Sequence, residues 1–270
     1  MGYRLIAIDL DETLLNSELK ISLRNKQAIR KAVQQGVKVT IATGRMFKTS
    51  IPYVRDLELN QDWPMINYHG ALIKTTETRR VIYHQPIENR LAVAIAREAE
   101  KRGYHVNVYI DDRLYIREEN EYSRYYQTIA AVDLEAVGAL APFLEKWGAN
   151  PTKLTILNRG GALSEAEAVF KAGFGDHIAA MQTRPHFLEI TDRRATKGQA
   201  LHRLAEQEGI KREEILAFGD SCNDLDMIRY AGLGVAVANA MPEVLRAADL
   251  VAESNVNDGV ARVIEEVVLI

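Results

Sequence analysis

Short apolar segments alternate with helical patterns in the N-terminal part of the chain. Residues 3–8 hold four consecutive apolar residues, a run typical of a strand buried on both faces of a parallel sheet. Ser22 can cap a helix that continues to about Gln35, and a second apolar strand is expected from Val37 to Ala42. This strand–helix–strand order predicts two parallel strands joined by a right-handed crossover.

The C-terminal third repeats this alternation of strands and helices. Its last helix, from about Asp258, places apolar residues at i, i+3, i+4 and i+7, the period of a helix with one buried face. Together the two ends predict an α/β core, with a Rossmann-like parallel sheet and helices on both faces. The other elements expected here are a helix over Gly198–Glu208, a strand over Ile215–Phe218, a short helix near Leu225 and Ile228, and a strand over Leu233–Val237.

The middle of the chain has a different pattern. Alternating apolar residues in Tyr104–Ile110, followed by a turn and by Leu114–Ile116, predict a β-hairpin. Because hairpins belong to antiparallel or mixed sheets, we expect an α+β domain inserted into the parallel core. The expected boundaries are residues 1–82 and 191–270 for the core and residues 83–190 for the insert. Further elements expected in the insert are helices near 87–102, 118–129 and 133–146 and strands near 153–157, 177–182 and 187–191.

The composition of the 270 residues is that of an ordinary globular protein, with 47% hydrophobic and 26% charged residues. The formal net charge of −3 argues against a nucleic-acid partner, because nucleic-acid-binding domains are usually strongly basic. The single cysteine excludes a disulfide framework within the chain. There is neither a long apolar run nor a signal-peptide pattern, so we expect a cytoplasmic protein without a membrane partner. The oligomeric state stays open, a homo-oligomer included.

Two acidic segments directly follow predicted strands, Asp9 to Thr13 at the N-terminus and Gly219 to Asp224 near the C-terminus. Since ligands of open parallel sheets bind beyond the carboxyl ends of the strands, these carboxylates are expected to surround one site. Oxygen ligands of this kind suit Mg²⁺ together with a substrate phosphate. Taken alone, each segment could also be a solvated turn or a helix cap. A calcium loop is excluded, because its sixth and twelfth positions are Leu14 and Lys20 and not Gly and Glu.

Two further segments have the chemistry of a phosphate site. Thr43 and Gly44 follow the second strand and open a helix, where a hydroxyl and free backbone amides suit a phosphate, although Thr-Gly is also an ordinary turn. Lys197 begins a helix, where the helix dipole is unfavourable for a cation, which indicates a functional role. Taken alone, however, a lysine at this position is more often simply exposed to solvent. In combination, the carboxylates, the hydroxyl and the lysine predict a phosphoryl-transfer site.

Four short motifs stand in order along the chain. They are Asp9-Leu10-Asp11-Glu12-Thr13, Ala42-Thr43-Gly44-Arg45, Thr196-Lys197-Gly198-Gln199-Ala200-Leu201 and Gly219-Asp220-Ser221-Cys222-Asn223-Asp224. In this order they resemble the four motifs of the haloacid dehalogenase superfamily, specifically its Cof-type phosphatases with a large α/β cap (type IIB). The resemblance covers essentially the whole chain, and the gap between the second and third motifs is similar to the family's cap in length.

The resemblance implies a role for each motif. It implies that Asp9 is the nucleophile, which forms an aspartyl-phosphate, and that Asp11 is the general acid for the leaving oxygen and then the base for water. The implied electrostatic effect of Mg²⁺ and Lys197 is to let an anionic carboxylate approach an anionic phosphate. The residues implied at the phosphate are Leu10, Thr43, Gly44, Lys197 and Asn223, and those at Mg²⁺ are Asp9, Asp220, Asp224 and Asp11, the last through its backbone carbonyl.

The chain departs from the family pattern at two positions. Glu12 stands where many relatives have glycine, so its side chain must point away from the phosphate. His69 stands where relatives often carry asparagine, and it could contact the leaving group, although we favour a local hydrogen bond. Tyr122, Tyr125 and Tyr126 in the insert could line a substrate cleft or could pack as one face of a helix.

These features predict a Mg²⁺-dependent phosphatase for small soluble phosphomonoesters, such as sugar phosphates or related metabolites. A phosphomutase on the same fold is an alternative, in which the aspartyl-phosphate returns to a substrate. A non-catalytic phosphate-binding module is a further alternative, which the presence of both Asp9 and Asp11 disfavours. The sequence does not name the substrate, and we expect specificity to reside in the inserted domain.

Overall fold

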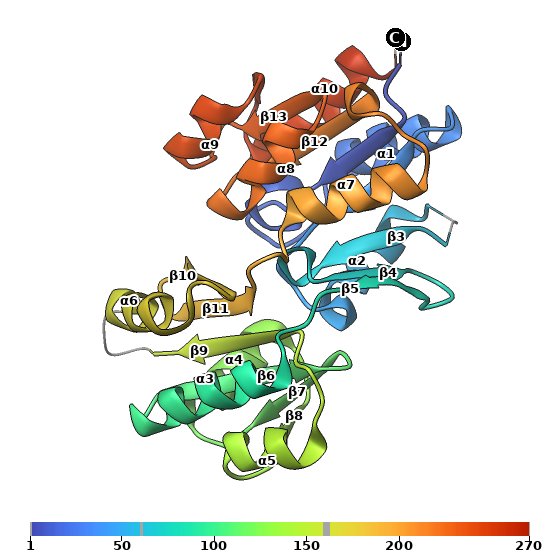
Figure 1. Cartoon of the computed structure of the whole chain (residues 1–270). Coiled ribbons are helices and arrows are strands. Elements are labelled where there is room, and N and C mark those ends of the chain that lie inside the picture. The colour runs from blue at the N-terminus through green and yellow to red at the C-terminus, as the bar shows by residue number, and fades with distance from the viewer. Residues whose placement is uncertain (1, 60–61, 159–162, 270) are drawn as a thin grey trace. The chain divides into compact units, whose positions relative to one another are not determined.

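The computed structural model describes residues 2–59, 62–158 and 163–269, which divide into two units (Figure 1). The first unit contains residues 1–83 and 196–270, and the second contains residues 84–195. The second unit is therefore an insertion between two parts of the first. The chain enters it within β5 (Val81–His84).

A parallel sheet forms the centre of the first unit. Each of its strands pairs in parallel with its neighbours, and most of its residues are buried, as expected for a sheet that is covered on both faces. The predicted Rossmann-like core is confirmed. Within the described residues the strand order is β14 (Leu250–Ala252), β13 (Leu233–Val237), β12 (Ile215–Gly219), β1 (Leu5–Ile8) and β2 (Lys38–Ile41).

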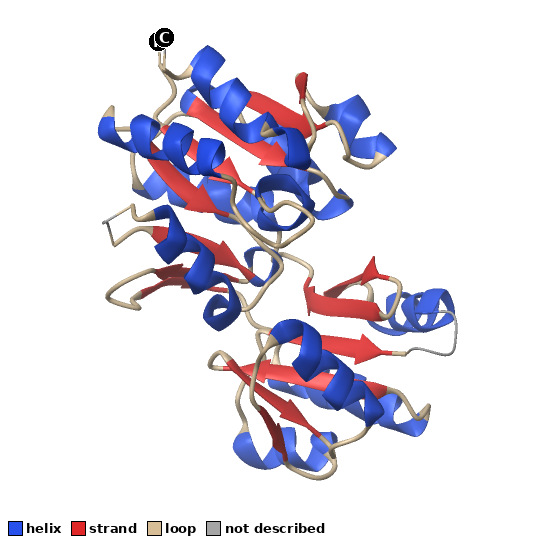
Figure 2. Ribbon diagram, turned by 180° about the vertical axis from the view of Figure 1, so that it is seen from behind, coloured by secondary structure: helices blue, strands red, loops and turns tan. Residues whose placement is uncertain are grey.

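Helices cover both faces of this sheet, as Figures 1 and 2 show from opposite sides. Leu5 and Ala7 of β1 share one buried cluster with Leu201 and Met227, so the two helices that carry these residues, α7 and α8, lie on the same face. The alternate residues of β1 point to the other face, where α1 and α10 lie. The helices of this unit are α1 (Leu23–Gln34), α2 (Phe47–Leu57), α7 (Lys197–Gln207), α8 (Leu225–Tyr230), α9 (Pro242–Ala247) and α10 (Gly259–Val267).

Local sequence signals set the ends of α1. The Ser22 hydroxyl accepts a hydrogen bond of 3.1 Å from the Asn25 N–H, as predicted for an N-cap. Gly36 follows the helix with φ +86°, a conformation that glycine adopts without steric penalty. The chain then turns directly into β2, which completes the predicted strand–helix–strand unit.

A small sheet of β3 (Pro64–Asn67), β4 (Leu72–Thr75) and β5 extends the first unit beside β2. The sequence pattern had indicated no strands in this segment. Its link to the main sheet is a parallel bridge between Ala42 and Ile66, with the Thr43 N–H donating to the Ile66 carbonyl at 2.9 Å. This bridge places the end of β3 next to the end of β2.

The second unit contains a mixed sheet, as the predicted hairpin requires. β6 is paired antiparallel with β7 and β9, whereas β7 and β8 are parallel. Within the described residues the strand order is β10 (Ile178–Arg184), β11 (Phe187–Asp192), β9 (Lys153–Leu157), β6 (His105–Ile110), β7 (Arg113–Ile116) and β8 (Leu134–Ala136). The helices are α3 (Asn89–Lys101), α4 (Glu121–Ala130), α5 (Leu140–Trp147) and α6 (Leu163–Phe174).

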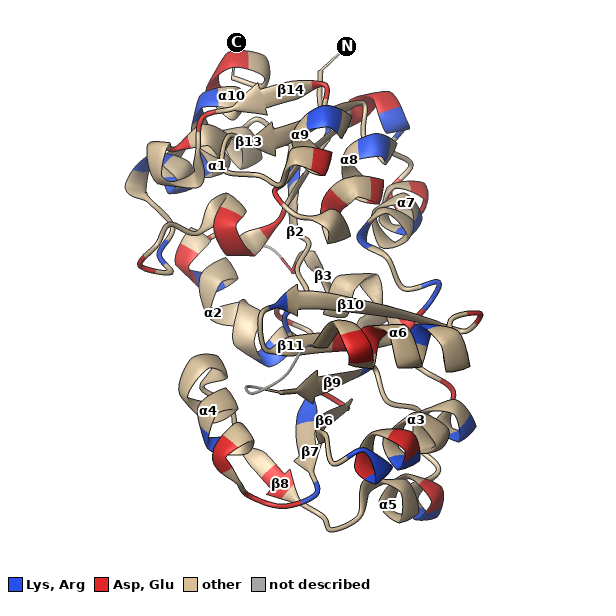
Figure 3. Ribbon diagram, turned by 90° about the vertical axis from the view of Figure 1, so that its left-hand side faces the viewer, with Lys and Arg blue, Asp and Glu red and all other residues tan. Residues whose placement is uncertain are grey.

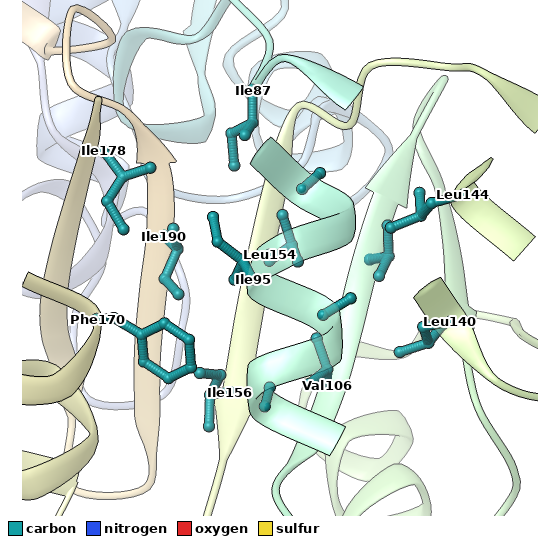
Figure 4. Packing of buried hydrophobic residues seen from close by; sticks show 14 of the residues in the cluster. Ile87, Ile95, Val106, Leu140, Leu144, Leu154, Ile156, Phe170, Ile178 and Ile190 are labelled. Carbon is teal, nitrogen blue, oxygen red and sulfur yellow. The ribbon is translucent and has the colours of Figure 1, made fainter. Parts of the chain in front are cut away.

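One face of this sheet carries the apolar core of the unit. Val106, Leu154, Ile156 and Ile190 point toward α3, α5 and α6, and Phe170 of α6 fills the space between strands and helix (Figure 4). The outer surfaces of α3 and α5 carry charges of both signs (Figure 3), which pair in places, as Arg97 and Glu145 do at 2.6 Å.

The opposite face of the sheet carries polar residues at the alternate positions, and α4 packs on part of it. Tyr109 of β6 donates a hydrogen bond of 2.7 Å to the Tyr126 hydroxyl. The ring of Tyr122 stacks on His105, with ring centroids 5.7 Å apart. The ring centroids of Tyr125 and Phe187 lie 6.1 Å apart. All three tyrosines of α4 therefore pack on the sheet, and the alternative that they line a substrate cleft stays a prediction.

The helix predicted near residues 133–146 is wrong in its first half. Residues 134–136 form β8, and α5 begins only at Leu140. Two residues explain the difference: Gly138 has φ +77°, and Pro142 has no N–H to donate to the carbonyl four residues earlier. Starting the helix at Leu140 places Pro142 in the first turn, where that N–H would have no helical partner.

Candidate active site

The carboxyl end of β1 places Asp9 at the centre of a buried ionic cluster. Its N–H donates to the Phe218 carbonyl of β12 at 3.0 Å, which fixes the backbone between two strands. Its side chain is only 7% exposed, and Oδ1 accepts a hydrogen bond of 2.5 Å from Lys197 Nζ. Burial raises the pKa of Asp9, while the ammonium group of Lys197 opposes that shift.

Lys197 is completely buried, so an ordinary surface lysine is excluded. It begins α7 directly after the N-cap Thr196, and its Nζ bridges Asp9 Oδ1 and Asp224 Oδ1, each at 2.5 Å. Burial by itself would lower the pKa of Lys197, but Asp224 and Asp9 raise it above its ordinary value. Lys197 is therefore held in its cationic form between two carboxylates, in a position closed to solvent.

Asp9, Asp220 and Asp224 form a group of oxygen donors that suits a hard divalent cation. One carboxylate oxygen of each lies within 4.8 Å of the other two. Asp224 Oδ2 also accepts hydrogen bonds of 3.1 Å from the N–H groups of Asp220 and Ser221, which hold the loop after β12. Burial, and then the Asp224 charge, raise the pKa of Asp220 to about 6. A cation bound among these carboxylates would relieve their mutual repulsion.

Asp11 lies outside this cluster of carboxylate groups and is held by Arg45. The guanidinium donates two hydrogen bonds, from Nε to Asp11 Oδ2 at 2.7 Å and from Nη2 to Asp11 Oδ1 at 2.6 Å. Burial opposes the charge of Arg45, but these bonds raise its pKa above the ordinary value. Arg45 is the last residue of the second motif, and the sequence alone assigned it no role, although an arginine directly after the phosphate turn is a signal for an anionic partner.

Thr43 and Gly44 lie in the turn after β2, and α2 begins only at Phe47, later than predicted. The Thr43 hydroxyl is buried and accepts from the Arg45 N–H at 3.1 Å, which leaves its proton for another acceptor. Gly44 has no room for a side chain, because a Cβ there would lie 2.3 Å from His69 Cε1.

Asn223 and Leu10 complete the predicted phosphate set. Asn223 Nδ2 lies 3.1 Å from Nδ1 of His69, which is 7% exposed, so the structure shows a local hydrogen bond at His69. The side chain of Leu10 is fully buried. Any contact of Leu10 with a phosphate would therefore involve its backbone.

Glu12 occupies a backbone conformation that favours glycine, with φ +58°. This explains why glycine suits the position. The Glu12 side chain is exposed to solvent, and its carbonyl accepts a hydrogen bond of 2.8 Å from Asn239 Nδ2. A left-handed residue between Asp11 and Thr13 turns the chain so that Thr13 can donate to Asp220 Oδ1 at 3.0 Å.

The strand-end carboxylate of Asp9 accepts a hydrogen bond from a buried lysine and belongs to a group of carboxylates that could hold a metal ion, an arrangement that suits a hydrolase of the phosphoryl-transfer class. The chain belongs to the family of haloacid dehalogenase-like hydrolases, whose sequence model matches residues 6–264. Several relatives are named phosphatases, and the function of this chain as a phosphatase of the family follows from its membership. No described helix combines the length and the apolar character that crossing a membrane requires.

One relative of known sequence and two solved structures are similar to this chain over nearly their whole length. A 5-amino-6-(5-phospho-D-ribitylamino)uracil phosphatase of Bacillus subtilis, YwtE, is 31% identical over 284 residues, covering 97% of this chain and 96% of its own. The crystal structure of TM0651 from Thermotoga maritima has a TM-score of 0.87 and 33% identity, with 98% of this chain and 97% of that chain covered. The structure of BT4131, described as a subclass IIB sugar phosphatase, has a TM-score of 0.83 and 25% identity, with 97% and 98% covered.

Proposed function

We propose that this protein is a Mg²⁺-dependent phosphatase that hydrolyses small soluble phosphomonoesters through an aspartyl-phosphate. The observation that carries the proposal is the position of Asp9, whose carboxylate is bonded to the buried Lys197 and grouped with Asp220 and Asp224. An anionic nucleophile needs such a cationic environment to approach an anionic phosphate.

In the first step an Asp9 oxygen forms a bond to phosphorus, and the bond from phosphorus to the leaving oxygen breaks. Asp11 donates a proton to that oxygen. In the second step water forms a bond to phosphorus, Asp11 takes its proton, and the bond to the Asp9 oxygen breaks. Thr43, Lys197 and Asn223 would hold the phosphoryl oxygens, and Leu10 and Gly44 would present backbone amides.

The pairing of Asp11 with Arg45 fits the second of these steps. A guanidinium at 2.6 to 2.7 Å favours the ionised carboxylate, which is the form that accepts a proton from water. The first step needs a protonated Asp11, so we infer that this ion pair loosens when a substrate binds. Arg45 then acts as a positioning residue for the acid and base.

Mg²⁺ would be held by Asp9, Asp220 and Asp224 together with the backbone carbonyl of Asp11. When bound, it supplies positive charge that neutralises phosphoryl oxygens. Removal of divalent metal with EDTA should abolish activity, and Mg²⁺ should restore it better than Ca²⁺, which takes more ligands at longer distances. Activity that survives EDTA, or equal activity with Ca²⁺, would contradict a magnesium site.

The substrate class we propose is sugar phosphates or closely related phosphorylated polyols. The support is that YwtE is named for a phosphoribitylamino substrate and BT4131 is described as a sugar phosphatase. The substrates that these two names describe share a phosphate on a polyhydroxylated carbon chain.

The test of the proposed reaction is the release of inorganic phosphate from a panel of phosphorylated metabolites by wild type and by Asp9→Asn. The variant keeps the shape of the side chain but loses the nucleophile, so we expect a folded protein without turnover. Phosphate release by a well-folded Asp9→Asn protein would refute the mechanism. Transfer of the phosphoryl group between substrates without free phosphate would instead indicate a phosphomutase.

We also propose that the inserted unit, residues 84–195, determines which ester is hydrolysed. All residues proposed for the chemistry lie in the first unit. Replacing the insert by a short Gly-Ser loop should preserve hydrolysis of p-nitrophenyl phosphate but remove discrimination among larger metabolites, because remote binding energy is lost. The measurement is kcat/KM across the panel. An unchanged substrate ranking in a folded protein without the insert would refute this assignment.

A further inference from the structure

His69 lies where the segments that carry the proposed phosphate ligands meet. Its backbone N–H donates to the Thr43 carbonyl at 3.1 Å. Its imidazole packs directly on the backbone of Gly44, since a Cβ there would lie 2.3 Å from Cε1 and 2.6 Å from Nε2. Its Nδ1 lies 3.1 Å from Asn223 Nδ2. One buried side chain thus connects the turn after β2 with the loop after β12.

The hydrogen bond between these side chains runs from Asn223 to His69. The Ser221 hydroxyl donates to Asn223 Oδ1 at 2.7 Å, so the amide oxygen faces Ser221 and the amide nitrogen faces the imidazole. With the amide in this orientation, its nitrogen donates to His69 Nδ1. This chain of two hydrogen bonds fixes the orientation of the Asn223 amide.

The turn that carries His69 has an uncommon backbone conformation. Tyr68, His69 and Gly70 all have positive φ, at 51°, 57° and 101°. Gly70 has no space for a side chain, because a Cβ there would lie 2.1 Å from the carbonyl oxygen of Thr196, the residue that precedes Lys197. Such conformations persist only where the surrounding structure determines them, and they cluster at functional sites.

We propose that His69 is a positioning residue for phosphate binding, which orients the Asn223 amide relative to the Thr43–Gly44 turn. The proposal rests on the proposed function, because it concerns the phosphoryl group of the same substrates. His69 acts through Asn223 and through the Gly44 backbone, and its contribution is to binding more than to the chemical step.

The test is a double-mutant cycle with His69→Gly and Asn223→Ala. Glycine removes the imidazole and accepts the positive φ, so the backbone of the turn is not strained. The measurements are the Kd of inorganic phosphate in the presence of Mg²⁺ by calorimetry, and KM and kcat for p-nitrophenyl phosphate. We expect His69→Gly to raise Kd and KM by about five- to tenfold, the effect of losing one neutral hydrogen bond, with a smaller change in kcat.

Two comparisons separate this role from a merely structural one. In the Asn223→Ala background, His69→Gly should change the phosphate Kd by less than about twofold, because its partner is already absent. His69→Asn should recover most of the affinity, because the asparagine oxygen can accept from Asn223 and asparagine tolerates positive φ. His202→Ala removes a half-exposed histidine of α7 and serves as the control without effect.

Each outcome decides the proposal. An unchanged phosphate Kd in His69→Gly, or equal losses with and without Asn223, would overturn it. A wild type that binds phosphate but hydrolyses no ester would overturn the proposed function, and the Kd values would still decide the role of His69. A wild type that binds no phosphate would overturn both.

Discussion

Replacing Lys197 by methionine should reveal how strongly the buried carboxylates repel one another. Lys197 is 0% exposed, and its Nζ donates to Asp9 and Asp224 at 2.5 Å each. Methionine has a similar length but no charge. Removing one partner of a buried ion pair costs ~3–5 kcal/mol, so we expect the free energy of unfolding to fall by about 4 kcal/mol at pH 7 without divalent metal.

The loss in free energy of unfolding of Lys197→Met relative to wild type should become smaller as the pH falls. Without Lys197 the folded-state pKa values of the carboxyl groups rise further, and that of Asp220 is already about 6 against 3.8 for an ordinary aspartate. At pH values between the unfolded-state and folded-state pKa values, the folded variant then binds more protons than the unfolded chain. Acidification in this range therefore favours folding. The difference between wild type and variant should therefore be smaller at pH 5 than at pH 7. Mg²⁺ at pH 7 should also recover part of the loss, because it supplies the missing positive charge.

The assay is urea unfolding followed by the fluorescence of Trp63, which packs against the core of the first unit. The chain contains two tryptophans, and a Trp147→Phe background leaves Trp63 as the reporter. The matched control is Lys197→Met combined with Asp224→Asn, which removes one of the repelling charges and should recover ~2 kcal/mol. A deficit below ~1 kcal/mol, or one of equal size at both pH values, would refute the reasoning.

Two further predictions concern a polar contact in each unit. Arg45→Lys keeps a positive charge but loses the bidentate hydrogen bond to Asp11. Steady-state kinetics should therefore show a fall in kcat of at least about tenfold with little change in KM. An unchanged kcat would exclude a positioning role for Arg45. Burial lowers the pKa of His105, whose Nδ1 accepts from Asn120, the N-cap of α4. The unfolded chain therefore binds the proton first, and wild type should lose stability as the pH falls below about 6.5, whereas His105→Gln should lose less. The measurement is urea unfolding followed by the fluorescence of Trp147, which lies in the second unit with His105, in a Trp63→Phe background.

The elements that the sequence predicted are those specified by local signals. β1, β12 and β13 appear as short apolar runs, and α1 has its serine cap and its glycine stop, all within a few neighbouring residues. The strands β3 to β5 and the helix α6 were not predicted. The three strands are short and are stabilised by pairing with partners elsewhere in the chain, as Ile66 is with Ala42, so they carry no decisive periodicity of their own.

The sequence also determined which residue types are present for the chemistry, since the motifs after β1, β2 and β12 each place polar side chains at a strand end. Only the tertiary structure decided their partners. Lys197 reaches Asp9 across 188 positions, and Asn223 reaches His69 across 154. The central order β12–β1–β2 brings the carboxyl ends of these strands to one edge of the sheet, and strand order depends on long-range pairing that no local pattern encodes. For the same reason the burial of Lys197 and the pairing of Asp11 with Arg45 became visible only once the sheet was assembled.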